Sequence, residues 1–415
     1  MMTHARSAQR WLLIAGLYFT QGIPLGLAME ALPALLRRQG ASLDSLAFLP
    51  LVGLPWVLKF LWASQVDNHG SDALGRRRSW ILPMQALVLL CLAGAAWLGM
   101  ASASAPAIIA LAAIGSIASA TQDIATDGLT AEHFHGPALA RANALQIGGT
   151  MLGFFFGGSG CLLLIGMLGQ HMALSILAVP VAGSLLLAWG WQERTTTQAA
   201  ARPDRASLRG FIVRRGAWPL LFAAFLSAMT AVAGYGLSKL LLIDAGWPLE
   251  AVGQVGIVGG MVTVILGCGG GAWLVGRFGA RRIFAGGIAV SAMAACLWIW
   301  LAGMSPALPV AWVWLATVSG CFGSGAASVA MMTMAMAFAG KGGQAGTDMT
   351  AIQSTRDLGE ISTSSSLTAV AAQLGYAGSF MAGAAIAALT LAGFVALCLG
   401  AVMALCGAQF ALRRS

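Results

Sequence analysis

Charged residues are scarce in this 415-residue chain: only 9% are Asp, Glu, Lys or Arg, while 58% are hydrophobic. Soluble domains carry about 25% charged residues, because their surface must face water. The composition therefore excludes a soluble globular protein and indicates a protein that crosses a membrane several times.

Three kinds of chemical motif are also missing. No glycine-rich run ends in Lys and Ser or Thr, so the sequence has no P-loop and we do not expect this chain to hydrolyse ATP. The seven cysteines all fall in apolar segments without metal-ligand spacing, and we expect them to pack there. No nucleophile–base pair is visible at membrane depth. We therefore predict no enzyme activity, no metal and no cofactor.

Long apolar segments recur along the whole chain, each long enough to cross ~30 Å of hydrocarbon. They lack the alternating period and the ~10-residue length of barrel strands. The first has no small-residue cleavage site, so we expect it to be retained as a span. The sequence predicts an all-α polytopic membrane protein with twelve transmembrane helices, at 11–36, 44–66, 79–100, 106–130, 141–168, 172–191, 217–243, 250–276, 282–303, 308–339, 347–372 and 378–410.

The basic residues predict the orientation of these helices. If the N-terminus is cytoplasmic, eighteen of the 23 Lys and Arg fall in or beside cytoplasmic loops and tails. The positive-inside rule therefore places both termini in the cytoplasm. The net charge of +9 needs no nucleic-acid partner, because it follows from this topology and from attraction to anionic lipid headgroups.

One long polar stretch, 192–216, separates span six from span seven. We interpret it as a cytoplasmic linker between an N-terminal six-helix bundle, 1–191, and a C-terminal six-helix bundle, 217–415. Three short matches at nearly one offset support a 6+6 repeat. They pair 35–46 with 241–252, 75–78 with 279–282, and 142–146 with 349–353.

An acidic pair interrupts the end of span four in the stretch "TQDIATDG", 121–128. Asp123 and Asp127 are four residues apart and share a helix face. Ionisable groups in a bilayer are costly, and two like charges at this spacing favour a proton on one carboxyl. We predict that Asp123 couples protons or forms a cytoplasmic gate, with Gln122 as a hydrogen-bond neighbour. Alternatively, the arginine cluster of the 75–78 loop or Arg141 neutralises both acids, which then only brace the inner end.

Two further buried charges lie near the predicted periplasmic ends of spans one and seven. Glu30 and Lys239 occupy related positions in the two halves of the repeat. We predict an ion pair between the bundles that closes an outer gate. The alternative is that Lys239 extends to the outer headgroups.

Span eleven carries Arg356, Asp357 and Glu360 within one helical turn. They form either a self-neutralising trio or a site for a substrate anion or a proton. Lys59 can pair with an acid of span four, which the sequence leaves open. The candidates for a central cavity are Gln21, Lys59, Gln146, Gln353, Arg356, Asp357 and Glu360.

Glycines predict where helices approach closely. Gly149, Gly153 and Gly157 share one face of span five, and "GCGGG" at 267–271 lies in span eight. Such small-residue faces let another helix pack at short distance.

Two loops resemble the loop signature of the major facilitator superfamily, in which a glycine and an acid precede a glycine and a basic cluster. They are "ASQVDNHGSDALGRRR" between spans two and three and "GAWLVGRFGARR" between spans eight and nine. The matching residues are Asp67, Gly75, Arg76, Arg77 and Arg78 in the first copy, and Arg277, Gly279, Arg281 and Arg282 in the second. In the second copy, Gly276 stands where the acid belongs.

We interpret these loops as cytoplasmic latches, in which the acid, a helix end and the arginine cluster meet. Such pairs bias a closed state by ~1–3 kcal/mol, the scale of typical coupling energies. The alternative is that the arginines only set the topology. The resemblance also implies that helices one, four, seven and ten line a central cavity.

Two other stretches, "GLPWVLKFLWASQVD" at 53–67 and "SATQDIATDG" at 119–128, are similar to the muropeptide-permease and acetyl-coenzyme A transporter branch of that superfamily. The opening "GLYFTQGIPLGL" at 16–27 and the short chain resemble the branch's siderophore importers, the RhtX/FptX type.

This resemblance implies a bacterial inner-membrane secondary transporter that works as a monomer by alternating access. The implied cargo is an iron-loaded siderophore, ferri-pyochelin above all, carried from periplasm to cytoplasm with protons. A permease for muropeptides or other amphiphilic metabolites is the alternative with the same fold. A membrane-embedded ligand sensor or receptor is the alternative from another class.

Overall fold

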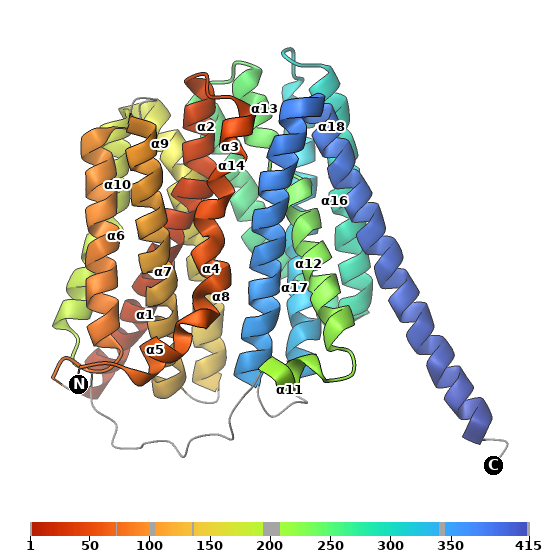
Figure 1. Cartoon of the computed structure of the whole chain (residues 1–415), viewed down its shortest axis with the longest axis horizontal. Helices are drawn as coiled ribbons and strands as arrows, with labels where there is room; N and C mark the ends of the chain where they lie inside the picture. Colours follow the sequence, from red (N-terminus) through yellow and green to blue (C-terminus); the bar gives the residue numbers. More distant parts are fainter. Residues whose placement is uncertain are drawn as a thin grey trace. The chain divides into compact units, whose positions relative to one another are not determined.

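The computed structural model is helical throughout the residues that it describes, which are 2–71, 73–99, 104–134, 137–193, 208–339 and 345–412 (Figure 1). Eleven helical segments in this part of the chain are long and apolar enough to cross a membrane. The last of them, Asp348–Ala396, contains Gly375, whose φ of +71° and ψ of 176° end one helix and start the next. Two predicted spans therefore share this segment, and the all-α prediction is confirmed.

The first span contains a π-helical turn. Helix α1, Met2–Gly26, continues through a π-helical turn, Leu27–Ala31, into α2, Leu32–Arg38. A second π-helical turn, Phe156–Gly160, joins α8, Pro137–Phe155, to α9, Cys161–Leu168. The two π-helical turns contact each other. π-helical turns are rare and are often found at functional sites.

The second span is broken rather than continuous. It consists of α3, Leu43–Leu46, α4, Leu54–Leu58, and α5, Ala63–Asn68, joined by 3₁₀ turns at Leu49–Gly53 and Lys59–Leu61. Pro50 and Pro55 explain the first break, because proline lacks the N–H that a continuous helix needs. Irregular backbone at membrane depth is tolerated where it is buried in protein or lines a wet cavity.

The remaining helices match the other predicted spans, except for the short helix α11, which lies within the predicted linker 192–216. They are α6 Arg78–Leu98, α7 Ala105–His133, α10 Gln170–Gly190, α11 Leu208–Ile212, α12 Ala217–Ala233, α13 Ser238–Asp244, α14 Leu249–Met261, α15 Gly271–Phe278, α16 Ala280–Gly303, α17 Val310–Ala339 and α18 Ala345–Leu412. A third π-helical turn, Val262–Gly270, joins α14 to α15.

The chain forms two compact units that do not follow the boundary expected from the sequence. The first comprises 1–204 together with 237–264 and 305–307, and the second comprises 205–236, 265–304 and 308–415. Helices α13 and α14 thus belong to the first unit, where α13 packs on α2 and α14 packs on α9. The division into six-helix bundles at 1–191 and 217–415 stays a prediction.

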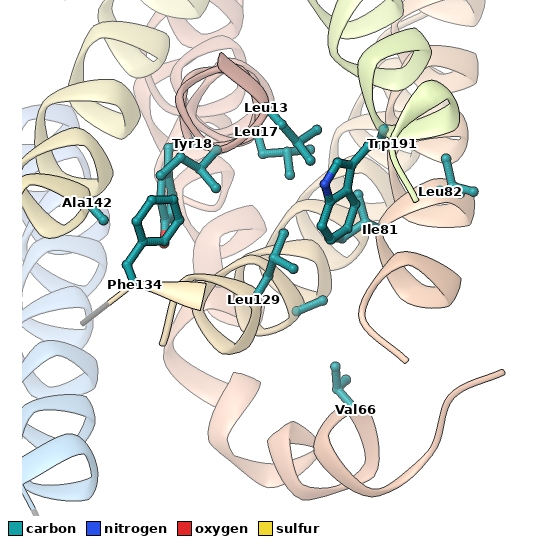
Figure 2. Packing of buried hydrophobic residues seen from close by; sticks show 13 residues of the cluster. Leu13, Leu17, Tyr18, Val66, Ile81, Leu82, Leu129, Phe134, Ala142 and Trp191 are labelled. Atoms are coloured by element: carbon teal, nitrogen blue, oxygen red, sulfur yellow. The ribbon is translucent and has the colours of Figure 1, made fainter. Parts of the chain in front are cut away.

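The core of the first unit is built around α1. Leu13, Leu17 and Tyr18 of this helix are buried against Ile81 of α6 and Leu129 of α7 (Figure 2). Helix α1 therefore has little freedom to rotate about its axis, and its polar residues are held at fixed positions.

Glycines let α8 approach α1 closely, as predicted. A Cβ at Gly153 would collide with the carbonyl oxygen of Phe19, and one at Gly22 would collide with the backbone of Thr150. In the second unit, a Cβ at Gly267 would lie 2.8 Å from the Cα of Gly325. Both predicted glycine faces therefore lie at close helix contacts.

Candidate functional site

A buried ion pair joins the second and fourth spans of the first unit. The Nζ of Lys59 contacts the Oδ2 of Asp123, and the Asp123 side chain is 4% exposed. The other carboxylate oxygen, Oδ1, accepts a hydrogen bond of 2.8 Å from the Nε2 of Gln21 on α1. Lys59 reaches this position because it lies at the 3₁₀ turn where span two is broken.

One turn along α7, Asp127 has different partners. The hydroxyl of Tyr18 donates to its Oδ1 at 2.9 Å, and the Nε2 of Gln146 donates to the same oxygen at 2.7 Å. In the described part of the chain, its Oδ2 has no hydrogen bond. Asp123 is thus bound by a cation, whereas Asp127 is bound by neutral donors.

Three helices supply these partners in register. Each contributes two side chains one turn apart, which is the spacing that puts them on one face. The inner rung contains Tyr18 of α1, Asp127 of α7 and Gln146 of α8; the outer rung contains Gln21 of α1, Asp123 of α7 and Thr150 of α8. We call these six residues together with Lys59 the acidic site.

Three further contacts complete the acidic site. Gln21 also donates to the hydroxyl of Thr150 at 3.0 Å, and Tyr18 shares a hydrogen bond of 2.9 Å with Thr130. The ring of Trp56 has its centroid 5.1 Å from the Nζ of Lys59. Lys59 therefore lies between a carboxylate and an aromatic face, both of which stabilise its charge.

The sequence predictions for this region are corrected at Gln122. Its Nε2 donates to the backbone carbonyl of Leu17 at 3.2 Å, and Gln21 occupies the place expected for it beside Asp123. The physical reason is that successive residues of a helix point about 100° apart, so Gln122 faces the α1 backbone. The side chain of Arg141, the alternative partner, lies outside the described residues.

The ion pair expected near the ends of spans one and seven is present. The Nζ of Lys239 lies 2.5 Å from the Oε2 of Glu30, which also accepts a hydrogen bond of 2.8 Å from Ser159. Glu30 lies in the first π-helical turn and Ser159 in the second, so the contact of these turns positions both side chains. The role of this pair as an outer gate stays a prediction.

A second ion pair at the same helix ends was not predicted. The guanidinium of Arg37 donates two hydrogen bonds of 2.7 Å to the two carboxylate oxygens of Asp244. The repeat that aligns 35–46 with 241–252 carries a signal for it, because opposite charges occupy nearly equivalent positions at the ends of the first and seventh spans.

In the first latch loop, an acid from outside the loop, Glu193, meets the start of α6 at the arginine cluster. The Glu193 carboxylate accepts hydrogen bonds of 2.9 Å from the backbone N–H of Arg77 and of Arg78, at the start of α6. The Arg78 guanidinium donates to the carbonyl of Ala188 at 3.0 Å. The side chain of Asp67 lies outside the described residues.

The other latch residues are placed as follows. Arg76 is exposed and Gly75 has a φ of +95°, which favours glycine. In the second loop, Gly279 has a φ of +86° and ends α15. The basic residues of this loop are exposed: Arg277, Arg281 and Arg282.

Span eleven does not form a tight trio. The Nη2 of Arg356 lies 3.7 Å from the Oε1 of Glu360 and donates to the hydroxyl of Ser328 at 3.2 Å. Asp357 and Gln353 are partly buried on the same helix. The loose Arg356–Glu360 contact is longer than a hydrogen bond.

Another buried pair was not anticipated from the sequence. Arg214, which precedes α12, contacts the fully buried carboxylate of Asp348 and donates to the carbonyl of Phe338 at 2.7 Å. In the sequence, Arg214 is one of several arginines in the polar stretch 192–216. No local sequence signal separates it from its neighbour Arg215.

The helices and the buried charges together define a polytopic membrane protein with the fold of the major facilitator superfamily. Two crystal structures share this fold. The nucleoside transporter NupG is 15% identical, with a TM-score of 0.66 over 93% of this chain and 98% of that chain. A bacterial homologue of the human lysosomal transporter Spinster, inward-facing and unoccupied, is 14% identical, with a TM-score of 0.69 over 94% and 96%.

Sequence comparisons are more specific. The family described as Acetyl-coenzyme A transporter 1 matches residues 9–166. The anhydromuropeptide permease of Escherichia coli (strain K12) is 30% identical over 301 residues, which are 69% of this chain and 60% of the permease. An uncharacterised protein of Haemophilus influenzae is 27% identical over 66% of this chain and 70% of that protein. The chain thus spans about 60% of the permease's length.

Residues 9–166 are thus similar to the acetyl-coenzyme A transporter family, and 301 residues of the chain are similar to the muropeptide permease. The matched residues 9–166 contain all seven residues of the acidic site. The proteins whose names state a role are transporters or permeases, in agreement with the prediction that this chain is not an enzyme.

Proposed function

We propose that this protein is a proton-coupled secondary transporter of the bacterial inner membrane that imports an acidic amphiphilic metabolite of the muropeptide type. The observation that carries this proposal is the acidic site. Two carboxylates, one turn apart and within a membrane span, have partners from three other spans. Ionisable groups at such depth generally mark an ion or substrate pathway.

The two carboxylates have different roles in this proposal. Asp127 accepts and releases the proton, because its neutral donors both bind Oδ1 and leave Oδ2 open. Asp123 holds Lys59 and transmits the change, because a proton on Asp127 relieves the repulsion between the two acids. The sequence favoured Asp123 for coupling; we propose Asp127 as the proton carrier instead, and its neutral partners support this choice.

The ion pairs at the ends of spans one and seven form the outer gate in this proposal. Glu30 and Arg37 from the first span bind Lys239 and Asp244 from the seventh. Alternating access requires that such contacts break when the transporter opens to the other side. While they are formed, ion pairs of this kind favour the state in which the outer gate is closed.

The muropeptide class is favoured as cargo because the permease similarity extends over 301 residues. A ferric siderophore such as ferri-pyochelin is the second candidate, on the resemblance of the stretch 16–27 to siderophore importers. Both are amphiphilic compounds with acidic groups. A sensor that binds without transport is the alternative from another class.

The test uses purified protein in proteoliposomes with an imposed pH gradient. We expect labelled anhydromuropeptide to accumulate against its gradient and to leave when a protonophore is added. Ferric pyochelin is assayed in parallel, and empty liposomes provide the background. Accumulation of pyochelin alone would assign the second cargo. Binding of either compound without counterflow would reject transport in favour of a sensor.

A further inference from the structure

Arg356 is a half-buried cation whose charge is only loosely compensated among the described residues. Its side chain is 17% exposed and lies in the span Asp348–Ala396. The guanidinium has one hydrogen bond, to Ser328, and its Nε is buried without a partner among the described residues. A guanidinium carries five N–H donors, so most of its donor capacity is unused.

Four other buried or half-buried cations bind a carboxylate at closer range. Lys59 and Arg214 each contact a carboxylate directly. Lys239 lies 2.5 Å from its acid, and Arg37 binds Asp244 through two hydrogen bonds of 2.7 Å. For Arg356 the corresponding distance is 3.7 Å. A charge with such a loose partner in a membrane span indicates that an anion binds there transiently.

The face of α18 that carries Arg356 is polar over three turns. Gln353 lies three residues before Arg356, Glu360 four after it and Thr363 seven after it, so all four share this face. The hydroxyl of Thr363 is also buried without a hydrogen-bond partner among the described residues. Two unpaired donors therefore lie along one stripe.

We propose that Arg356 binds the carboxylate of the transported substrate. The planar guanidinium fork matches a carboxylate through two parallel hydrogen bonds, whereas the present contact with Glu360 is too long for one. Glu360 then acts as the resident competitor, which keeps the site neutral when it is empty. This inference rests on the proposed transport function, and it specifies that the protein recognises the cargo by its carboxylate.

A native cysteine reports on the site without any knowledge of the cargo. Cys268 and Arg356 contact α17 one turn apart, because the thiol of Cys268 lies 3.9 Å from the carbonyl oxygen of Gly325 and Arg356 binds Ser328; the Cys268 side chain is partly exposed. The test uses full-length protein in which Cys268 is retained and the other six cysteines are replaced by serine. Rates of reaction are measured with an anionic sulfonate and a cationic trimethylammonium methanethiosulfonate reagent.

We expect the ratio of anionic to cationic reagent rates at Cys268 to fall about 10-fold in Arg356→Gln, because a nearby positive charge concentrates anions. Arg356→Lys keeps the charge and should keep most of the ratio. Arg209→Gln, on exposed α11, is the matched control and should leave the ratio unchanged. An unchanged ratio in Arg356→Gln, or a Cys268 that reacts with neither reagent, overturns the proposal.

Glu360→Gln separates a binding site from a purely structural pair. Removal of the competitor should raise the affinity for labelled anhydromuropeptide, opposite to Arg356→Gln. If the pair only neutralises itself, Glu360→Gln should not bind the muropeptide more tightly than the wild type. Monodisperse elution of each variant shows that it is folded.

The cargo is tested separately by equilibrium binding of labelled anhydromuropeptide and of its carboxamide. We expect the wild type to bind the carboxylate form about 10-fold more tightly, and Arg356→Gln to abolish this preference. If the wild type binds neither form but Cys268 retains its Arg356-dependent preference for anions, the anion site stands and the muropeptide assignment fails. If the wild type binds the carboxylate and Arg356→Gln keeps the preference, the inference fails and the proposed function stands.

Discussion

Lys59 and Asp123 are 64 residues apart in sequence and form a direct ion pair inside the first unit, with side chains that are 14% and 4% exposed. Span two supplies the lysine from a 3₁₀ turn, and span four supplies the acid from a continuous helix. The pieces of span two pack against α7 of span four, and this contact positions both charges. The pair links the broken span to the acidic site.

Removing one partner of this pair should destabilise the protein more than removing both. Lys59→Gln or Asp123→Asn leaves a buried charge without its partner, which typically costs about 3–5 kcal/mol. The double variant leaves no uncompensated charge and should recover much of that loss. The midpoint of thermal unfolding in detergent measures this difference. A double variant less stable than both single variants would show that the two residues do not act as a pair.

The outer ion pairs should control access to the buried thiol of Cys161, which directly follows the second π-helical turn. In Lys239→Gln, the closed state loses its contact with Glu30, and we expect alkylation of Cys161 from the periplasmic side to become about 10-fold faster, equivalent to ~1.4 kcal/mol. The charge swap Glu30→Lys with Lys239→Glu should slow it again. Equal rates in all three proteins would remove this pair from any gating role.

Close packing of α8 on α1 should make Gly153 intolerant of any side chain. A Cβ there meets the carbonyl of Phe19, so Gly153→Ala should separate the helices and lower the stability by about 1–3 kcal/mol. Gly148→Ala is the matched control, since a Cβ at Gly148 meets nothing within 4 Å. Both variants are compared by thermal unfolding and by transport rate. Equal behaviour would contradict the close contact.

Glu193 should stabilise the start of α6. Its carboxylate accepts the N–H groups of Arg77 and Arg78, and an acid at a helix N-terminus typically contributes about 0.5–2 kcal/mol. Glu193→Ala should lower the unfolding midpoint, and Glu193→Gln should retain part of the effect because its amide oxygen still accepts. High salt screens charges, so the drop in the unfolding midpoint caused by Glu193→Ala should be smaller at high salt. A Gln variant as unstable as Ala would assign the whole effect to charge.

The sequence predicted the features that depend on local composition. Long apolar runs indicated the spans, and the glycine pattern indicated where α8 meets α1. It also identified Asp123, Asp127, Gln21, Gln146 and Lys59 as candidates, because polar residues are conspicuous within apolar segments. These residues all meet in the acidic site; the sequence offered a pair of Lys59 with an acid of span four, without deciding it, and did not pair the others.

The pairings depended on three-dimensional packing and could not be derived from the sequence. Gln122 and Gln21 are equally polar, and only the rotation of each helix decides which faces Asp123. Likewise, Glu193 lies at the start of a polar stretch where nothing in the sequence marks it. Its role depends on the end of α10 lying beside the start of α6. The compact units also cross the sequence boundary, because tight contacts at the outer helix ends join α13 and α14 to the first unit.

Coupled transport by Asp127→Asn is the most direct test of the proposed mechanism. Uphill uptake and downhill exchange of labelled anhydromuropeptide are measured in the same proteoliposomes, with Thr355→Ala as a control distant in sequence from the acidic site. Because the variant cannot lose a proton at this position, we expect it to exchange substrate at near wild-type rate but to show no accumulation driven by the pH gradient. Accumulation equal to that of the wild type would contradict the assignment of Asp127 as the proton carrier.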